Sequence, residues 1–124
     1  TTVDVEFYGN PYDDMNQNYR GTALIEEVMA NMDLDFEPGP AALGGSSDIG
    51  NVSYQCAALH PKLRLAGEPK VCHAKEFADA MVDPTIEQTI IDGANIIGGA
   101  LLRLVENPTT LEEIVAEFKK SLGE

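Results

Sequence analysis

Apolar residues recur at spacings of three and four along several stretches of the chain, which is the pattern of helices that bury one side. The first such stretch covers residues 18–32, and Asp13, Asp14 or Asn16 just before it could cap the helix. Two methionines in its stripe are typical of core filling. The stripe consists of Leu24, Ile25, Val28, Met29 and Met32.

The longest helical pattern follows Pro84, and Asp83 is the expected cap. Gly93, Gly98 and Gly99 lie inside it, and each destabilises a helix by ~1 kcal/mol relative to alanine. We therefore expect another backbone to approach this side of the helix closely. The expected core-facing stripe consists of Ile86, Ile90, Ala94, Ile97, Leu101 and Leu104, widened by Ile91, Leu102 and Val105.

Two further helices are predicted, one short and one at the C-terminal end. Residues 74–81 form a short helical pattern. Asn107-Pro108 is expected to end the long helix. The sequence Thr110-Leu111-Glu112-Glu113 is typical of a capping box at the N-terminus of the last helix. The last stripe consists of Leu111, Ile114, Val115, Phe118 and Leu122.

Strand patterns occupy three other places. Val3, Val5 and Phe7 alternate with polar residues, and Leu63 and Leu65 do the same. The apolar run at residues 52–59 suits either a buried strand or a short helix, because periodicity does not separate the two. We therefore predict an α/β fold, in which a small sheet near residues 5, 57 and 65 packs against the helix after Pro84.

Length and charge limit the classes of function. The chain has 124 residues, 44% of them hydrophobic, which suits one domain over residues 1–124. Its 21 acidic residues against 8 Lys plus Arg give a net charge of -13, so we expect no nucleic acid and no anionic membrane as partner. Neither a signal peptide nor an apolar run long enough to cross a membrane is evident in the sequence. Two cysteines are too few for a disulfide scaffold. These features predict a cytoplasmic protein.

The residue types that carry chemistry gather in residues 44–77. The glycine-rich segment at residues 44–48 could cradle an anion or present Asp48 to a ligand, but an ordinary loop with Asp48 as a cap is the favoured interpretation. No Gly-Lys-Ser/Thr follows, so it is no P-loop. His60 precedes Pro61, and a hydrogen-bonded, partly buried histidine is the more common case there.

His73 precedes a helix and is a candidate metal ligand or proton shuttle. With two histidines, two cysteines and no Cys-x-x-Cys, the chain shows at most part of a metal site. Cys56 and Cys72 could pair with His60 or His73 as nucleophile and base, although Cys56 lies in an apolar run, where a thiol is usually inert.

Three motifs occur in order in this region. The first is Gly45-Ser46-Ser47-Asp48-Ile49-Gly50-Asn51-Val52-Ser53, the second is Leu59-His60-Pro61, and the third is His73 with Glu76 and Phe77. Together they resemble the end of the catalytic domain of the M20 metallopeptidase family. The closest branch is the amidohydrolases, which include aminobenzoyl-glutamate hydrolases and aminoacylase-like dipeptidases. The resemblance extends from about Tyr8 to the C-terminus.

The resemblance implies an α/β catalytic domain with a mixed sheet and a site for two divalent metals, zinc or manganese. There a metal-bound water attacks the amide bond of a small-molecule substrate, such as an acyl-amino acid or a dipeptide, with a glutamate as general base. His73 corresponds to the family's last metal ligand. The substrate pocket would include Gly45, Ser46, Ser47, Asp48, Asn51 and His60.

Some features depart from the family. Members are much longer, and their other ligands and general base lie N-terminal to the part that this chain matches. Cys56-Ala57 replaces the usual apolar-proline pair, and Ile49-Gly50 supplies no arginine for a substrate carboxylate. We therefore expect the C-terminal portion of an enzyme, inactive alone, and a homo-oligomer through surfaces that lack their neighbours. The alternative is a stand-alone acidic α/β module that binds a partner without catalysis.

Overall fold

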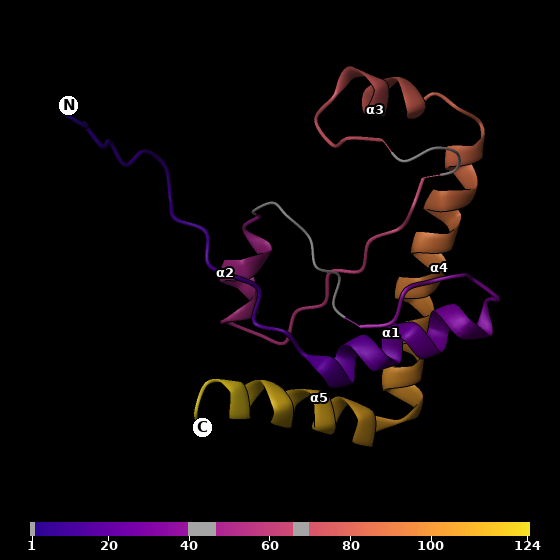
Figure 1. Cartoon of the computed structure of the whole chain (residues 1–124). Helices are drawn as coiled ribbons and strands as arrows, with labels where there is room; N and C mark the ends of the chain where they lie inside the picture. The colour runs from indigo at the N-terminus through magenta and orange to yellow at the C-terminus, as the bar shows by residue number, and fades with distance from the viewer. Residues whose placement is uncertain (1, 40–46, 66–69) are drawn as a thin grey trace.

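The computed structural model describes residues 2–39, 47–65 and 70–124 (Figure 1). These ranges contain helices and irregular segments but no strand, so the predicted α/β fold with a mixed sheet is wrong. Every predicted helix is present within a few residues of its expected range. The helices are α1 (Tyr19–Asn31), α2 (Ile49–Ser53), α3 (Lys75–Ala80), α4 (Thr85–Glu106) and α5 (Pro108–Ser121).

The hydrophobic core lies where α1, α4 and α5 meet. Helix α1 crosses the long helix α4, and α5 folds back from the end of α4 to lie beside α1 (Figure 1). The predicted stripe of α1 is confirmed, because its four central members are buried. The buried cluster consists of Leu24, Ile25, Val28 and Met29 of α1, Ile96 and Ala100 of α4, and Ile114 of α5.

None of the three regions predicted as strands forms a strand in the described chain: the apolar run at residues 52–59 begins inside α2, and the other two are irregular segments. Val3, Val5 and Phe7 are exposed, with Phe7 at 94%, and Figure 1 shows this N-terminal segment running away from the helices. Leu63 packs against the helical core, although its neighbours form no ladder. A strand is stable only when an adjacent strand takes its backbone hydrogen bonds. Here α1, not a sheet, covers α4.

The cap of α1 is Asn18, and none of the three residues proposed from the sequence takes that position. Asn18 is 3% exposed. Its Oδ1 accepts a hydrogen bond from the Gly21 amide at 2.8 Å, and its Nδ2 donates to the Ile114 carbonyl at 2.9 Å. One side chain therefore caps α1 and ties it to α5.

Helix α5 supplies a second set of partners to the start of α1. The Glu117 carboxylate accepts hydrogen bonds from the amides of Tyr19 and Arg20, at 3.0 and 2.7 Å. A carboxylate at a helix N-terminus satisfies free amides and interacts favourably with the helix dipole. The Arg20 guanidinium in turn donates to Glu113 at 2.6 Å and to the buried Thr110 hydroxyl at 3.1 Å.

The capping box predicted at Thr110 is wrong. Helix α5 begins at Pro108. Proline has no amide hydrogen, and the first residue of a helix has no intrahelical acceptor for one, so no hydrogen bond is lost at this position. The Thr110 side chain accepts from Arg20 instead of capping its own helix. The contact with α1 has therefore replaced the local interaction.

Helix α4 lies where it was predicted, but its predicted stripe is buried only in part. Ile86 of the stripe is buried and Leu104 packs against the core, whereas Ile97 and Leu101 are 58% and 60% exposed. In the middle of the helix Ile96 and Ala100 are buried instead. The helix is apolar on two sides, so the pattern alone did not select the one that α1 covers. None of the helices in the described ranges combines the length and the apolar composition that a bilayer crossing needs.

The glycines of α4 differ in their surroundings. A Cβ on Gly99 would lie 3.0 Å from the Val28 Cγ1 of α1, and one on Gly93 would lie 3.2 Å from Leu63 Cδ1. The expected approach of another backbone is therefore not observed at these two positions, where side chains lie close instead. A Cβ on Gly98 would meet nothing within 4 Å.

Candidate functional site

The first motif spans the loop before α2 and α2 itself. Gly45 and Ser46 lie outside the described residues. Ser47 Oγ accepts a hydrogen bond from the Ile49 amide at 3.3 Å and contacts the Asp48 carboxylate at 3.4 Å. Asp48 occupies the N-terminal cap position of α2, as expected, but it is exposed and its side chain makes no capping hydrogen bond. The Ser47 hydroxyl accepts the amide hydrogen bond at the start of the helix instead.

The second half of the motif docks α2 onto the segment before α1. Gly50 is buried there, and a Cβ on it would lie 1.9 Å from the Asp13 carbonyl oxygen. Asn51 Nδ2 donates to the Pro11 carbonyl at 3.2 Å and to the Asp13 carboxylate at 3.1 Å. The side chain predicted to touch substrate therefore fastens the chain to itself.

Ser53 completes this docking. It is buried, and its Oγ accepts from the Asn16 amide at 2.8 Å and donates to the Gly50 carbonyl at 2.6 Å. Asn16 Nδ2 also donates to Ser121 Oγ of α5 at 2.8 Å. The Gly-Asn-x-Ser part of the motif thus joins α2 to the helical core through residue 16.

Tyr54 lies at the end of α2 and faces Asp14. Its hydroxyl donates to Asp14 Oδ1 at 3.0 Å. This hydrogen bond raises the pKa of Tyr54, because the carboxylate favours the protonated phenol. The contact is a second link between α2 and the segment before α1.

The two histidines are exposed and stand in different segments. His60 follows α2 in an extended stretch, and its predicted partial burial is not observed. His73 lies in the turn before α3 with a backbone φ of 66°, a conformation that histidine tolerates better than most residues. No hydrogen bond in the described residues links either of them to Asp48 or Asn51.

The cysteines do not form the arrangement of a nucleophile with its base. Cys56 and Cys72 are both free and exposed. Cys56 lies in the predicted apolar run but is itself exposed, so the run does not shield it from solvent. Within residues 2–39, 47–65 and 70–124, no three His, Cys, Asp or Glu side chains lie together as a metal site would need.

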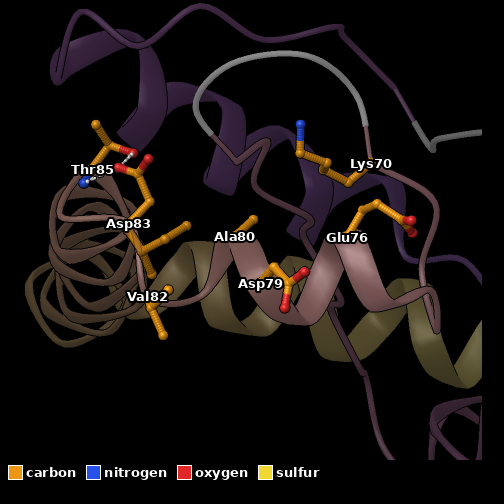
Figure 2. A pocket seen from close by; sticks show the side chains of 8 residues that line it. Lys70, Glu76, Asp79, Ala80, Val82, Asp83 and Thr85 are labelled. Atoms are coloured by element: carbon orange, nitrogen blue, oxygen red, sulfur yellow. Dashed lines mark hydrogen bonds between the residues drawn. The ribbon is translucent and has the colours of Figure 1, made fainter.

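An open hollow of about 500 Å³ lies between α3 and the start of α4, and Figure 2 shows its side chains. Asp83 Oδ1 accepts from the Thr85 amide at 2.9 Å and from the Thr85 hydroxyl at 2.7 Å, which lowers the pKa of Asp83. Asp79 pairs with Lys75 at 2.5 Å. The lining residues are Lys70, Glu76, Asp79, Ala80, Val82, Asp83, Thr85 and Ile86.

Two of the three carboxylates in this hollow are therefore engaged by neighbours, and Glu76 of the third motif is the remaining one. Asp79 was not predicted for any site. The spacing of Glu76 and Asp79 is the signal that could have found this pair, because positions three apart share one side of a helix, while Asp83 lies between α3 and α4. His73 does not line the hollow.

Comparisons with known proteins point to one class of enzyme. The chain is 25% identical over 126 residues to the Xaa-Arg dipeptidase of Mus musculus, and the match covers 99% of this chain. It covers 29% of the dipeptidase, so the chain spans less than a third of the length of this curated relative. No protein-family model matches the chain. No solved structure matches it significantly.

Proposed function

We propose that the chain is the C-terminal portion of a metal-dependent, peptidase-like hydrolase that cleaves the amide bond of an acyl-amino acid or a dipeptide-like substrate. The observation that carries this proposal is the similarity to Xaa-Arg dipeptidase over 99% of the chain. The three ordered motifs between residues 45 and 77, which lie within the matched span, also support it.

In this proposal His73 supplies one ligand to zinc or manganese. Its imidazole is exposed at the turn before α3 and has no hydrogen-bond partner in the described chain that would have to be displaced. A bound divalent ion would polarise the amide carbonyl and lower the pKa of a water molecule. A catalytic zinc normally takes three protein ligands. Since the chain has two histidines, we propose that the other ligands and the general base come from additional polypeptide.

The remaining candidates divide into two groups. Ser47, Asp48 and His60 stand at or near the surface, where a substrate could reach them. Asn51 acts indirectly in our proposal, because its amide holds residues 11–13 against α2 and thereby positions the loop before that helix. Gly45 and Ser46 complete the proposed pocket.

The first test uses the purified 124-residue chain. We expect no hydrolysis of acyl-amino acids or dipeptides in buffers with added zinc or manganese, because one credible ligand does not hold a catalytic ion. Product formation would be followed by chromatography, with a chelator-treated sample as control. Turnover that the chelator abolishes would overturn the proposed need for additional polypeptide.

The second test asks whether the source gene continues upstream with the missing ligands, which the intact mass of the natural protein would also reveal. In such a longer protein we expect His73→Ala and His73→Asn to lose activity and bound metal. The asparagine variant tolerates the backbone conformation at residue 73, so it separates loss of a ligand from strain in the turn. Lys75→Ala, at an exposed neighbour, should retain both. Full activity of His73→Asn would refute the ligand assignment.

A further inference from the structure

Helix α2 is too short to hold its own position. A helix of five residues is unstable by itself, because its first turn fixes more backbone angles than one hydrogen bond repays. The helices that pack on one another are α1, α4 and α5, and α2 lies apart from their common core (Figure 1). The place of α2, and with it the place of Ser47 and Asp48 at its start, therefore depends on the hydrogen bonds that dock it.

Asn16 connects α2 to α5. Its backbone amide donates to Ser53 Oγ at 2.8 Å, and its Nδ2 donates to the Ser53 carbonyl at 3.3 Å. The same Nδ2 donates to Ser121 Oγ, in the last turn of α5, at 2.8 Å. One residue therefore joins the ends of two helices that share no direct hydrogen bond in the described chain.

The two serine hydroxyls are oriented to accept hydrogen bonds from Asn16. Ser53 Oγ donates its hydrogen to the Gly50 carbonyl at 2.6 Å, and Ser121 Oγ donates to the Phe118 carbonyl at 2.7 Å. A hydroxyl has one hydrogen, so each serine presents lone pairs to residue 16. The side-chain amide of Asn16 has two hydrogens, which serve the Ser53 carbonyl and Ser121 Oγ. An amide fits this arrangement, whereas a carboxylate has no hydrogen to donate.

We propose that Asn16 is a positioning residue of the proposed hydrolase site, which transmits the position of α5 to α2 and thereby fixes where Ser47 and Asp48 stand. The part that these two residues play in substrate binding rests on the proposed function. The link between α5 and α2 rests on the three hydrogen bonds of Asn16. Ser53 is 0% exposed, so water does not readily replace Asn16 as its partner.

The two ends of this link differ in their access to solvent. An open hollow of about 480 Å³ lies between the segment before α1, the end of α2 and the end of α5, and both Asn16 and Ser121 line it. Ser121 is exposed, whereas Ser53 is buried. Since water competes for an exposed hydrogen bond, the bond to Ser121 should contribute less than the bond to Ser53.

Amide hydrogen exchange of the purified 124-residue chain, followed by NMR, measures the link without any need for activity. The Val52 amide reports on α2, because it donates to the Asp48 carbonyl at 3.2 Å. Asn16→Ala should lower the protection of this amide about tenfold, since it removes both hydrogen bonds of Nδ2. The buried amides of α1 should keep their protection, which separates local loosening from global unfolding.

Gln17→Ala is the matched control. Gln17 is the neighbouring side-chain amide and lines the same hollow, but it makes no hydrogen bond to α2 or α5 in the described chain. This variant should leave the exchange of the Val52 amide unchanged. An equal loss of protection in Gln17→Ala and Asn16→Ala would overturn the proposal, because the effect would then not depend on the hydrogen bonds of Asn16.

Ser121 variants test transmission from α5. Ser121→Ala should lower the protection of the Val52 amide about threefold, although Ser121 makes no hydrogen bond to α2. Ser121→Thr keeps the hydroxyl and should restore the protection. In the Asn16→Ala background Ser121→Ala should have no further effect, because both changes break the same bond. Effects that add, or an Asn16→Ala variant with unchanged protection, overturn the proposal.

Kinetics of a longer hydrolase polypeptide test the consequence for the site. With an acyl-amino acid or a dipeptide as substrate, Asn16→Ala should raise KM about threefold or more while kcat stays within about twofold. Bound metal should be unchanged, because His73 and not α2 carries the proposed ligand. An unchanged KM in a variant with loosened α2 overturns the positioning role. If the longer wild-type protein cleaves none of these substrates, the proposed function is refuted, and the exchange measurements still decide whether Asn16 links α5 to α2.

Discussion

Replacement of Asn18 tests how much this one side chain contributes to stability through its bonds within α1 and to α5. Asn18→Ala removes the cap of α1, which is worth ~1 kcal/mol, and the hydrogen bond to the Ile114 carbonyl, which is worth a further ~1 kcal/mol. We expect the free energy of unfolding to fall by about 2–3 kcal/mol. That is a large share of the roughly 5–15 kcal/mol by which a domain is stable.

Asn18→Asp separates the two contributions. The carboxylate keeps the cap and favours the positive end of the helix, but it cannot donate to Ile114 and faces the carbonyl oxygen instead. At neutral pH we expect a loss of about 1.5–3 kcal/mol, since the site is 3% exposed and the charge is partly desolvated. In acid the protonated side chain can donate, so the difference from wild type should shrink.

Urea unfolding followed by circular dichroism at 222 nm measures both variants. Asn107→Asp is the matched control, because Asn107 stands at the N-terminal cap of α5 without a side-chain bond and is exposed. It should change stability by no more than about 0.5 kcal/mol. If Asn18→Asp unfolds at the same urea concentration as wild type at neutral pH, then capping alone explains Asn18, and the bond to α5 contributes nothing.

Two further predictions concern α2 and α4. Gly50→Ala should destabilise the chain by about 1–3 kcal/mol, because its Cβ would meet the rigid Asp13 carbonyl. Gly98→Ala should be neutral or stabilising, because space is open there. Thermal unfolding compares the two variants, and equal midpoint temperatures would contradict the contact at Gly50. The folded-state pKa of Asp83 is lowered, so its stabilising bond to Thr85 is present above the unfolded pKa and is lost as the pH falls through the folded-state pKa. The protection of the Thr85 amide, measured as its exchange rate relative to the intrinsic rate at each pH, should therefore fall in acid, and Asp83→Asn should remove this pH dependence; an unchanged profile in the variant would refute it.

The helices could be predicted where the apolar pattern is one-sided. The stripe of α1 through Leu24 and Val28 is flanked by polar residues, so its helical character and its buried side follow from the same pattern. Helix α4 is apolar on two sides, and the choice between Ile96 and Ile97 depends on where α1 and α5 lie. That information is tertiary and is not contained in the pattern of one helix.

The strands and caps were mispredicted for related reasons. Alternation at Val3 and Val5 indicates a strand only if another strand lies beside it, and none does in the described chain. The local sequence at Thr110 suits a capping box, but Arg20 from a distant helix takes the hydroxyl. Likewise, the Ile114 carbonyl that accepts the hydrogen bond from the Asn18 side chain is 96 positions away in the sequence.

For the candidate site, too, the local sequence predicted some features, whereas others depend on tertiary contacts. Residue types identified the motif at residues 45–53 and the two histidines as candidates, although the exposure of His60 was not predicted, and the match to a dipeptidase agrees with the kind of enzyme they suggested. The sequence did not reveal that Asn51 and Ser53 fasten α2 to the segment before α1. Short polar side chains look alike in sequence whether they bind a ligand or another part of the chain.

The bonds between Asn18 and α5 have a consequence for the order in which the chain folds. They join residues 96 positions apart, and closing so long a loop costs about 4 kcal/mol of chain entropy before any contact repays it. Helices α4 and α5, which are adjacent in sequence, can form their contact early and without such closure. Helix α1 leaves the ribosome before α5 and must wait for residues 110–117 before its N-terminus is held. The chain should therefore fold more slowly than its helical content alone suggests, since rates follow the sequence separation of contacts.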